Sequence, residues 1–292
     1  MTPQPDSVRT IRLDDGRVLA WHEFGDAAGF PCLFFPGSAT SGRAGSALDE
    51  AAQRIGAKLI SVDRPGLGAS TRAPRRALRD WAADIEELSS ALTLTRFAVL
   101  GHSAGGAFAL AVAASMPRRV TRAVIAAGSP PYAERWTRDD HLVAPTTRFN
   151  NFLALATPAL FGRLFRLSAP RTRDAAERMV SALSRGRSED SRFVQRHPEI
   201  ARLLMESLGD GFAGGPDGPA EDVAIIARAW GFGLDAVSVP VHWWHGSADR
   251  NVRTETGRAI VARIPRATAH VISGGHFLLY DHAPEILASL TE

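Results

Sequence analysis

Cysteine is almost absent from this 292-residue chain, in which Cys32 stands alone. A single cysteine excludes an internal disulfide, and no cluster of Cys and His at ligand spacing indicates a structural metal. We therefore expect a reducing compartment, the cytoplasm, and neither a metal nor another cofactor. Lysine is as scarce, since Lys58 is the only one among the 34 basic residues. A catalytic lysine is therefore not expected.

Long hydrophobic runs are also missing. Nowhere do 18 consecutive apolar residues occur, and the opening MTPQPDSVRT has no basic start followed by an apolar core. We expect a chain that is neither exported nor membrane-spanning, with no membrane partner. An excess of charge is lacking too, because the formal net charge is +3 despite a pI near 9.7. The basic residues alternate with acidic ones and form no stripe that would follow phosphates, so no nucleic-acid partner is expected.

Apolar residues make up 45% of the chain, enough to bury the core of one large domain. Through the first 130 residues, short β-type runs alternate with helical patterns, which predicts a mostly parallel central sheet flanked by helices, the α/β class. The expected strands are a hairpin over 11–24, then 32–35, 58–62, 97–100 and 122–127, and the expected helices are 81–92 and 107–116.

The alternation stops after Gly128 and resumes with strands at 239–246 and 269–273 and helices around 254–263 and 284–291. The intervening hundred residues read as helical with Pro and Gly breaks, and a bare loop of that length is implausible. We therefore predict a core over 1–130 and 237–292, interrupted by a helical lid over 131–236. Within the lid, the glycine- and proline-rich stretch 209–222 is expected to be its flexible part.

One serine stands where a predicted strand passes into a predicted helix, in the sequence GHSAGG. The pattern G-x-S-x-G is weak evidence by itself, so its position carries the argument. A nucleophile elbow lies at such a strand-to-helix turn, where a strained backbone exposes the serine and glycines avoid clashes. Ser103 is the predicted nucleophile, and Gly101, Gly105 and Gly106 are the small neighbours that the turn needs.

A serine hydroxyl needs a base, and the base needs an acid to orient it. Asp249 follows one predicted strand, and His276 follows the next in a glycine-rich loop. The order Ser, Asp, His therefore predicts a triad of Ser103, Asp249 and His276. The other place for the acid, after the strand ending near residue 127, offers no carboxylate within 126–132.

Other histidines are weaker candidates for the base. His270 lies inside a predicted strand, His282 lies close to the last helix, and His245 precedes the turn that carries the acid. His102 adjoins the serine but is expected to point away from the elbow and to pack or hydrogen-bond there.

Five segments carry a family resemblance: FFPGS (34–38), SVDRPGLGAS (61–70), GHSAGG (101–106), HGSAD (245–249) and GGHF (274–277). On these five segments, the chain resembles the lidded, cofactor-free serine hydrolases of the α/β-hydrolase fold. The resemblance implies an oxyanion hole formed by the backbone amides of Ser38 and Ala104. Relatives commonly have His-Gly before the first of these residues, whereas this chain has Pro36 and Gly37. Relatives that open epoxides or displace halide use aspartate where this chain has Ser103, which disfavours those reactions.

The resemblance implies acyl transfer from a small-molecule substrate to Ser103 and then to water, with an ester carrying an apolar part as the first choice of substrate. A lactone, a thioester or a C–C bond beside a carbonyl would use the same groups. A proline-releasing peptidase would need a lid carboxylate to hold the substrate amine, for which Glu177, Glu199 and Glu206 are available. A receptor of negligible turnover is the alternative from another class, and the oligomeric state stays open.

The lid is also expected to supply an apolar pocket over the nucleophile. We single out Trp136, Phe149, Phe152 and Trp230 as substrate-binding candidates. Further aromatic candidates in the segment are Phe161, Phe165 and Phe232. Packing inside the lid is the alternative role for each.

Overall fold

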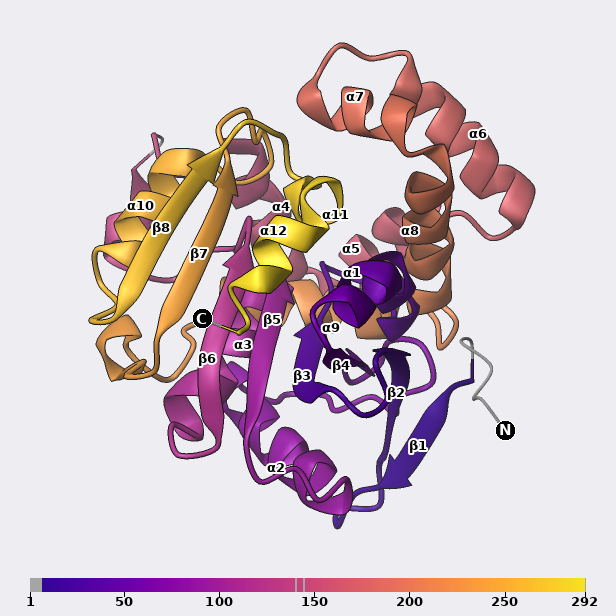
Figure 1. The fold of residues 1–292 in the computed structure, drawn as a ribbon. Helices are drawn as coiled ribbons and strands as arrows, with labels where there is room; N and C mark the ends of the chain where they lie inside the picture. The colour runs from indigo at the N-terminus through magenta and orange to yellow at the C-terminus, as the bar shows by residue number, and fades with distance from the viewer. Residues whose placement is uncertain (1–6, 140, 144, 292) are drawn as a thin grey trace.

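The computed structural model describes residues 7–139, 141–143 and 145–291. The first six residues, on which part of the expectation about export rests, lie outside this range. The described residues form a single sheet of eight strands (Figure 1). The strands are β1 (Arg9–Arg12), β2 (Val18–Gly25), β3 (Phe30–Phe35), β4 (Ala57–Asp63), β5 (Phe97–His102), β6 (Val120–Ala126), β7 (Val241–Gly246) and β8 (Ala267–Ile272).

The strand order across the sheet is β1-β2-β4-β3-β5-β6-β7-β8. The hairpin β1–β2 is antiparallel and β2 also runs antiparallel to β4, whereas every later pairing, from β4–β3 to β7–β8, is parallel. The predicted α/β class with a mostly parallel sheet is therefore confirmed. Parallel strands bring their carboxyl ends to one edge of the sheet, and there the candidate site lies.

Alternate side chains of the strands enter two large hydrophobic clusters, one on each face of the sheet. Leu33 and Trp243 belong to one cluster, whereas their neighbours Phe34 and Trp244 belong to the other. This is the two-residue periodicity of strands buried on both faces.

Helices cover both faces of the sheet (Figure 1). The first cluster includes side chains of α2 (Trp81–Ala91), α3 (Gly105–Ser115) and α10 (Thr254–Val261), and the second includes α1 (Asp49–Arg54), α11 (Leu278–Asp281) and α12 (Ala283–Ala288). The only cysteine, Cys32, lies fully buried on β3 in the second cluster, and burial raises the pKa of its thiol.

Between β6 and β7 the chain forms a run of helices, which we call the helical insertion. It contains α4 (Pro145–Ala156), α5 (Pro158–Leu167), α6 (Arg173–Ser184), α7 (Glu189–Arg196), α8 (Pro198–Gly211) and α9 (Asp217–Ala227). Helices α4, α5 and α9 pack together, as do α6, α7 and α8. The second group projects beyond the end of the sheet (Figure 1). The boundaries at residues 131 and 236 and the role of a lid stay predictions.

The stretch 209–222, expected to be flexible, is instead largely helical. It contains the end of α8 and the start of α9. Its small residues allow the chain to pack closely against the core. A Cβ atom added to Gly218 would lie 2.0 Å from the Gly66 carbonyl oxygen, so glycine is required for contact between insertion and core. Within the described residues, no helix has the length and hydrophobicity that crossing a membrane requires.

Candidate active site

Ser103 lies in the tight turn between β5 and α3. Its backbone has a φ of +52°, which L side chains rarely adopt, and its N–H donates to the Ala126 carbonyl over 2.9 Å. A Cβ atom added to Gly105 would lie 1.8 Å from the Phe35 carbonyl oxygen, and one added to Gly101 would lie 2.6 Å from the Gly105 oxygen. The glycines therefore allow α3 to begin just after Ser103, in close contact with the end of β3.

The structure brings the three predicted triad residues together. Asp249 follows β7 and His276 follows β8, at the same edge of the sheet as Ser103. The Nε2 atom of His276 lies 2.9 Å from the Ser103 Oγ atom, and its Nδ1 atom lies 2.9 Å from the Asp249 Oδ2 atom. Both are hydrogen-bond distances, so the three side chains form a continuous hydrogen-bonded chain.

The carboxylate of Asp249 is held in one orientation. Its Oδ1 atom accepts the backbone N–H groups of Asn251 at 2.8 Å and Val252 at 3.0 Å, which leaves Oδ2 facing His276. Burial raises the pKa of Asp249, but the His276 charge and the hydrogen bonds outweigh it and lower the pKa overall. Burial likewise opposes charging of His276, and the Asp249 carboxylate reverses the effect, so the pKa of His276 is raised. The aspartate is therefore ionised at neutral pH and favours the proton on Nδ1 of His276.

Two further buried histidines, His102 and His245, contact the loops that carry His276 and Asp249. The His102 side chain is buried, and its Nε2 atom lies 3.0 Å from the His276 carbonyl oxygen. His102 was expected to point away from the elbow, but it lines the cavity that contains Ser103, and its ring centre lies 5.2 Å from that of His276. Burial and the nearby His276 lower the pKa of His102 to about 3, so its ring is neutral and donates through Nε2–H. His245 Nε2 similarly contacts the Val252 carbonyl oxygen at 2.8 Å, and burial lowers the pKa of this ring.

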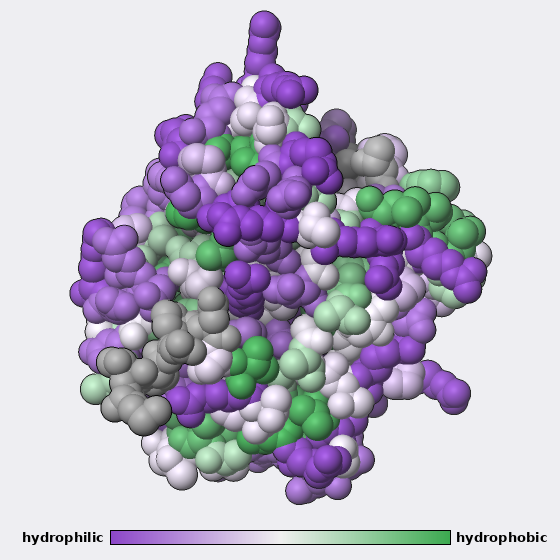
Figure 2. Space-filling model, turned by 90° about the vertical axis from the view of Figure 1, so that its right-hand side faces the viewer, coloured by the Kyte–Doolittle hydropathy of each residue, from purple (hydrophilic) through white to green (hydrophobic). Residues whose placement is uncertain are grey.

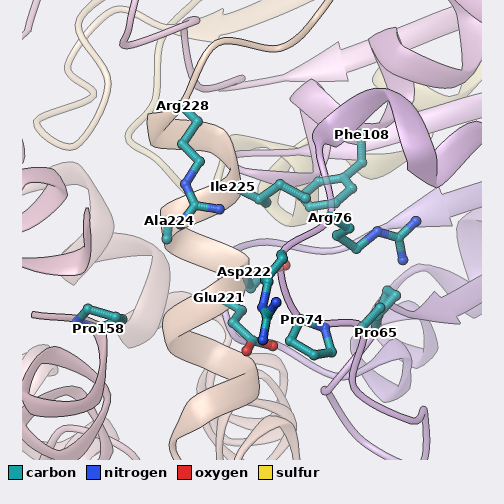
Figure 3. A pocket seen from close by; sticks show the side chains of 12 residues that line it. Pro65, Pro74, Arg76, Phe108, Pro158, Glu221, Asp222, Ala224, Ile225 and Arg228 are labelled. Carbon is teal, nitrogen blue, oxygen red and sulfur yellow. The ribbon is translucent and has the colours of Figure 1, made fainter. Parts of the chain in front are cut away.

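The loop after β3 is fixed by a buried ion pair. The Arg64 guanidinium donates to the Pro36 carbonyl at 2.5 Å and the Gly37 carbonyl at 2.7 Å, and it binds both carboxylate oxygens of Asp222 on α9. Asp222 also accepts the Ala39 N–H at 3.0 Å. Figure 3 shows Asp222 and Ile225 projecting from the same helix toward the core, where Phe108 lies. Asp222 thus links the helical insertion to the predicted oxyanion loop.

The direction of these carbonyl groups decides where the loop N–H groups point. In a trans peptide, the C=O of one residue and the N–H of the next point to opposite sides. Because the Gly37 C=O points to Arg64, the Ser38 N–H points away from it, and Ser38 lines the cavity that contains Ser103. In the described part of the chain, neither the Ser38 nor the Ala104 N–H forms a hydrogen bond. Both are free to bind an anion.

A second carboxylate from the insertion contacts the histidine loop. The Asp190 Oδ1 atom, in the first turn of α7, accepts the backbone N–H of His276 at 2.6 Å and of Phe277 at 3.2 Å. Burial raises the pKa of Asp190, and these N–H groups act against the rise. The helical insertion therefore holds the loops on both sides of Ser103, through Asp222 and Asp190.

Ser103 opens into a cavity of about 250 Å³. Its floor includes Ser103, His276 and the Ser38 loop, while its walls are mostly apolar. The apolar and aromatic side chains in the lining are Phe165, Leu204, Met205, Leu208, Phe277 and Tyr280. This lining contains no carboxylate and no lysine or arginine.

The four aromatic residues singled out from the sequence lie elsewhere. Trp136 and Trp230 line a separate cavity of about 240 Å³, where the Arg263 guanidinium lies 4.2 Å from the centre of the Trp136 ring. Phe149 and Phe152 lie on α4 and are 60% and 63% exposed. Of the wider aromatic set, Phe165 does line the Ser103 cavity.

Comparison with known proteins agrees with this arrangement. The family model described as alpha/beta hydrolase fold matches residues 31–283, which contain β4 to β8, all of β3 but its first residue, and the whole insertion. The chain belongs to the α/β hydrolase fold family.

Solved structures show the same fold as this α/β hydrolase. An esterase from Exiguobacterium antarcticum superposes with a TM-score of 0.70 at 17% identity, covering 97% of each chain. An enol-lactonase from Burkholderia xenovorans also gives 0.70, at 15% identity, covering 97% of this chain and 98% of the other. Among curated proteins, a non-heme chloroperoxidase from Streptomyces lividans is 32% identical over 129 residues, which are 42% of this chain and 45% of that protein. A proline iminopeptidase from Arabidopsis thaliana is 32% identical over 130 residues, which are 42% of this chain and 33% of that protein. The chain thus matches less than half the length of either curated relative.

Sequence reasoning missed three residues of this α/β hydrolase that hold the site in place: Arg64, Asp190 and Asp222. Arg64 stands inside the quoted segment SVDRPGLGAS, so its motif was visible although its role was not. Nothing local marks the two aspartates, because each acts across more than 80 residues of sequence.

Proposed function

We propose that this protein is a serine hydrolase that cleaves carboxylic esters of small, partly apolar molecules through an acyl-enzyme. The observation that carries the proposal is the hydrogen-bonded chain from Ser103 through His276 to Asp249, which opens into the apolar cavity. This arrangement is the one that activates a serine hydroxyl as a nucleophile.

The reaction starts when the Ser103 Oγ atom attacks the ester carbonyl and its proton passes to the Nε2 atom of His276. Asp249 holds the imidazole by its Nδ1–H and stabilises the imidazolium that forms. The N–H groups of Ser38 and Ala104 stabilise the oxyanion of the tetrahedral intermediate. His276 then gives its proton to the leaving alcohol, which leaves an acyl group on Ser103. Water, deprotonated by His276, attacks this acyl group in a second tetrahedral step. The intermediate then releases the acid, and the Ser103 Oγ atom takes the proton back from His276.

The cavity favours an ester over a peptide with a free amine. Such an amine would need a carboxylate beside the nucleophile, and the cavity lining has none. The lid carboxylates considered for that role are engaged elsewhere: Glu177 pairs with Arg173, Glu206 pairs with Arg202, and Glu199 lines a different cavity. The cavity volume of about 250 Å³ is below the usual range of ligand pockets, about 300–1,000 Å³, which favours a small substrate.

A fluorophosphonate probe tests the nucleophile directly. We expect the wild type to be labelled at one site and Ser103→Ala to lose both labelling and turnover while keeping its thermal midpoint. Ser247→Ala is the matched control, because Ser247 is exposed and lies close to Asp249 in the sequence without belonging to the triad. Labelling of Ser103→Ala, or its full activity, would refute the assignment.

A panel of p-nitrophenyl esters of increasing chain length tests the substrate class. We expect turnover of the short and medium esters and a decline once the acyl chain exceeds the cavity. Wild-type protein that takes the probe but hydrolyses none of these esters would leave the nucleophile in place and contradict the ester substrate.

A further inference from the structure

Helices α4 and α5 expose an apolar surface to solvent. Of the nine large hydrophobic side chains that are exposed in the described chain, six lie on these two helices. They are Phe149, Phe152, Leu155, Leu160, Leu164 and Leu167, which we call the α4–α5 face, and their exposed fractions run from 40% to 76%. Figure 2 shows hydrophobic residues gathered beside hydrophilic ones at the right-hand edge of the molecule.

This exposure does not result from a lack of partners inside the insertion. Both helices already pack on α9 through other positions, among them Ala154, Gly162 and the partly buried Phe161 and Phe165. The helices are therefore apolar on a buried side and again on a solvent side. Large apolar side chains that are exposed together on two packed helices indicate an interaction site.

The charged residues of the segment that forms the face have a single sign. From residue 141 to residue 173 the chain has five arginines and no aspartate or glutamate. Arg163 and Arg166 alternate with Leu164 and Leu167 along α5, and no ion pair in the described chain includes either arginine. A helix with leucine and phenylalanine beside unpaired arginines and no acid is the composition of helices that lie in a lipid–water interface.

We propose that the α4–α5 face docks the protein onto an anionic lipid surface. Phosphate groups would receive the arginines while the Phe and Leu side chains enter the layer beneath them. A second copy of the chain fits poorly, because a two-fold dimer through this face would bring its arginines against those of the partner. The absence of a long apolar run excludes a membrane-spanning helix but does not exclude docking on a membrane surface. The proposal departs from the expectation of no membrane partner.

Docking would place the substrate cavity next to the lipid. Phe165, between Leu164 and Arg166, lines the cavity of Ser103, so α5 contributes one side to the cavity and the other to the docking face. If the proposed ester hydrolysis holds, this arrangement points to amphiphilic esters in a lipid layer as the substrate class. The docking itself rests on the face alone.

Vesicle sedimentation tests the docking with the full chain. We expect wild-type protein to pellet with phosphatidylcholine vesicles that contain about a third phosphatidylserine, and far less with phosphatidylcholine alone. Raising the salt from about 0.1 to 1 M should weaken binding, since it shortens the screening length from about 10 Å to 3 Å. The pair Arg163→Gln and Arg166→Gln should lower the partition coefficient about 30-fold, about fivefold for each cation. Leu164→Ser with Leu167→Ser should lower it by at least about tenfold.

Matched controls come from α6, outside the face. Leu183→Ser removes a leucine that is 43% exposed, and Arg178→Gln removes an exposed cation, so both should bind vesicles as the wild type does. Thermal midpoints check folding, and hydrolysis of soluble p-nitrophenyl acetate checks the cavity. Wild type that stays in the supernatant, or face variants that bind like the controls, would overturn the proposal. So would a dimer, seen by sedimentation equilibrium, that dissociates only in the face variants. Vesicle binding without esterase activity would keep the docking and reject the proposed function, and the reverse result would do the opposite.

Discussion

Replacing the triad acid by its amide, Asp249→Asn, changes one atom and reverses one hydrogen bond. The Asn251 and Val252 N–H groups both point at Oδ1, so the amide oxygen of the new side chain must take that position. Its NH₂ group then takes the place of Oδ2, 2.9 Å from the His276 Nδ1 atom. A donor would face a donor there unless the imidazole moves its proton from Nδ1 to Nε2. With the proton on Nε2, His276 no longer accepts one from Ser103.

This reversal sets the size of the expected effect. Fixing the wrong histidine tautomer in a serine triad costs about 10⁴ in kcat, which corresponds to about 5.4 kcal/mol of activation free energy. The pKa of His276 should also fall, because the Asp249 carboxylate is the main group that raises it against the effect of burial. The stability should change little, because the amide oxygen keeps both backbone hydrogen bonds of the aspartate.

The assay is kcat for a p-nitrophenyl ester across pH, with thermal midpoints alongside. Asp15→Asn is the matched control, since the Asp15 side chain is 53% exposed in a turn distant from Ser103 in sequence and should leave kcat unchanged. Residual activity within tenfold of the wild type would refute the tautomer argument and place the orienting acid elsewhere.

Three further predictions follow from the site. Ser38→Ala should keep most activity, whereas Ser38→Pro, which lacks the N–H, should lower kcat by about 10² to 10³ in protein that circular dichroism shows to be folded; an inactive alanine variant would assign the donor to the hydroxyl. In the wild type, kcat/KM should rise with pH as His276 loses its proton, with a midpoint above the ordinary value of 6.5, because Asp249 outweighs burial; a midpoint well below that value would contradict this balance. Gly105→Ala should abolish activity or folding, because its Cβ atom would meet a carbonyl oxygen at 1.8 Å, while Gly214→Ala, with its nearest neighbouring atom at 3.9 Å, should retain the thermal midpoint of the wild type.

The sheet could be predicted from the sequence because its signals are local. Each core strand is a short apolar run that ends near glycine, proline or a polar turn, and the helix 81–92 repeats its apolar residues at helical spacing. Ser103, Asp249 and His276 could be placed for the same reason, since parallel strands of known order bring their carboxyl ends together. The geometry agrees with that placement.

The insertion could not be predicted in the same way. Helical periodicity indicates that a face is apolar but not which partner covers it, so Phe165 could not be separated from Phe149 as a cavity residue. The pairing of Asp222 with Arg64 joins residues 158 positions apart, and only the packed structure shows it. The nearly balanced charge of the whole chain gave no indication that residues 141–173 contain arginines and no acidic residue.

The two carboxylates that join the insertion to the core limit how this enzyme family can be recombined. A chimera that keeps this sheet and receives an insertion without carboxylates at these two positions would lose the contacts of Asp222 with the loop of Ser38 and of Asp190 with the loop of His276. Arg64 would then be a buried cation without its partner, and such unpaired charges are strongly destabilising. Transplanting a substrate pocket onto this core therefore requires both aspartates to be grafted with it, at the first turn of the helix equivalent to α7 and on the core-facing side of the helix equivalent to α9.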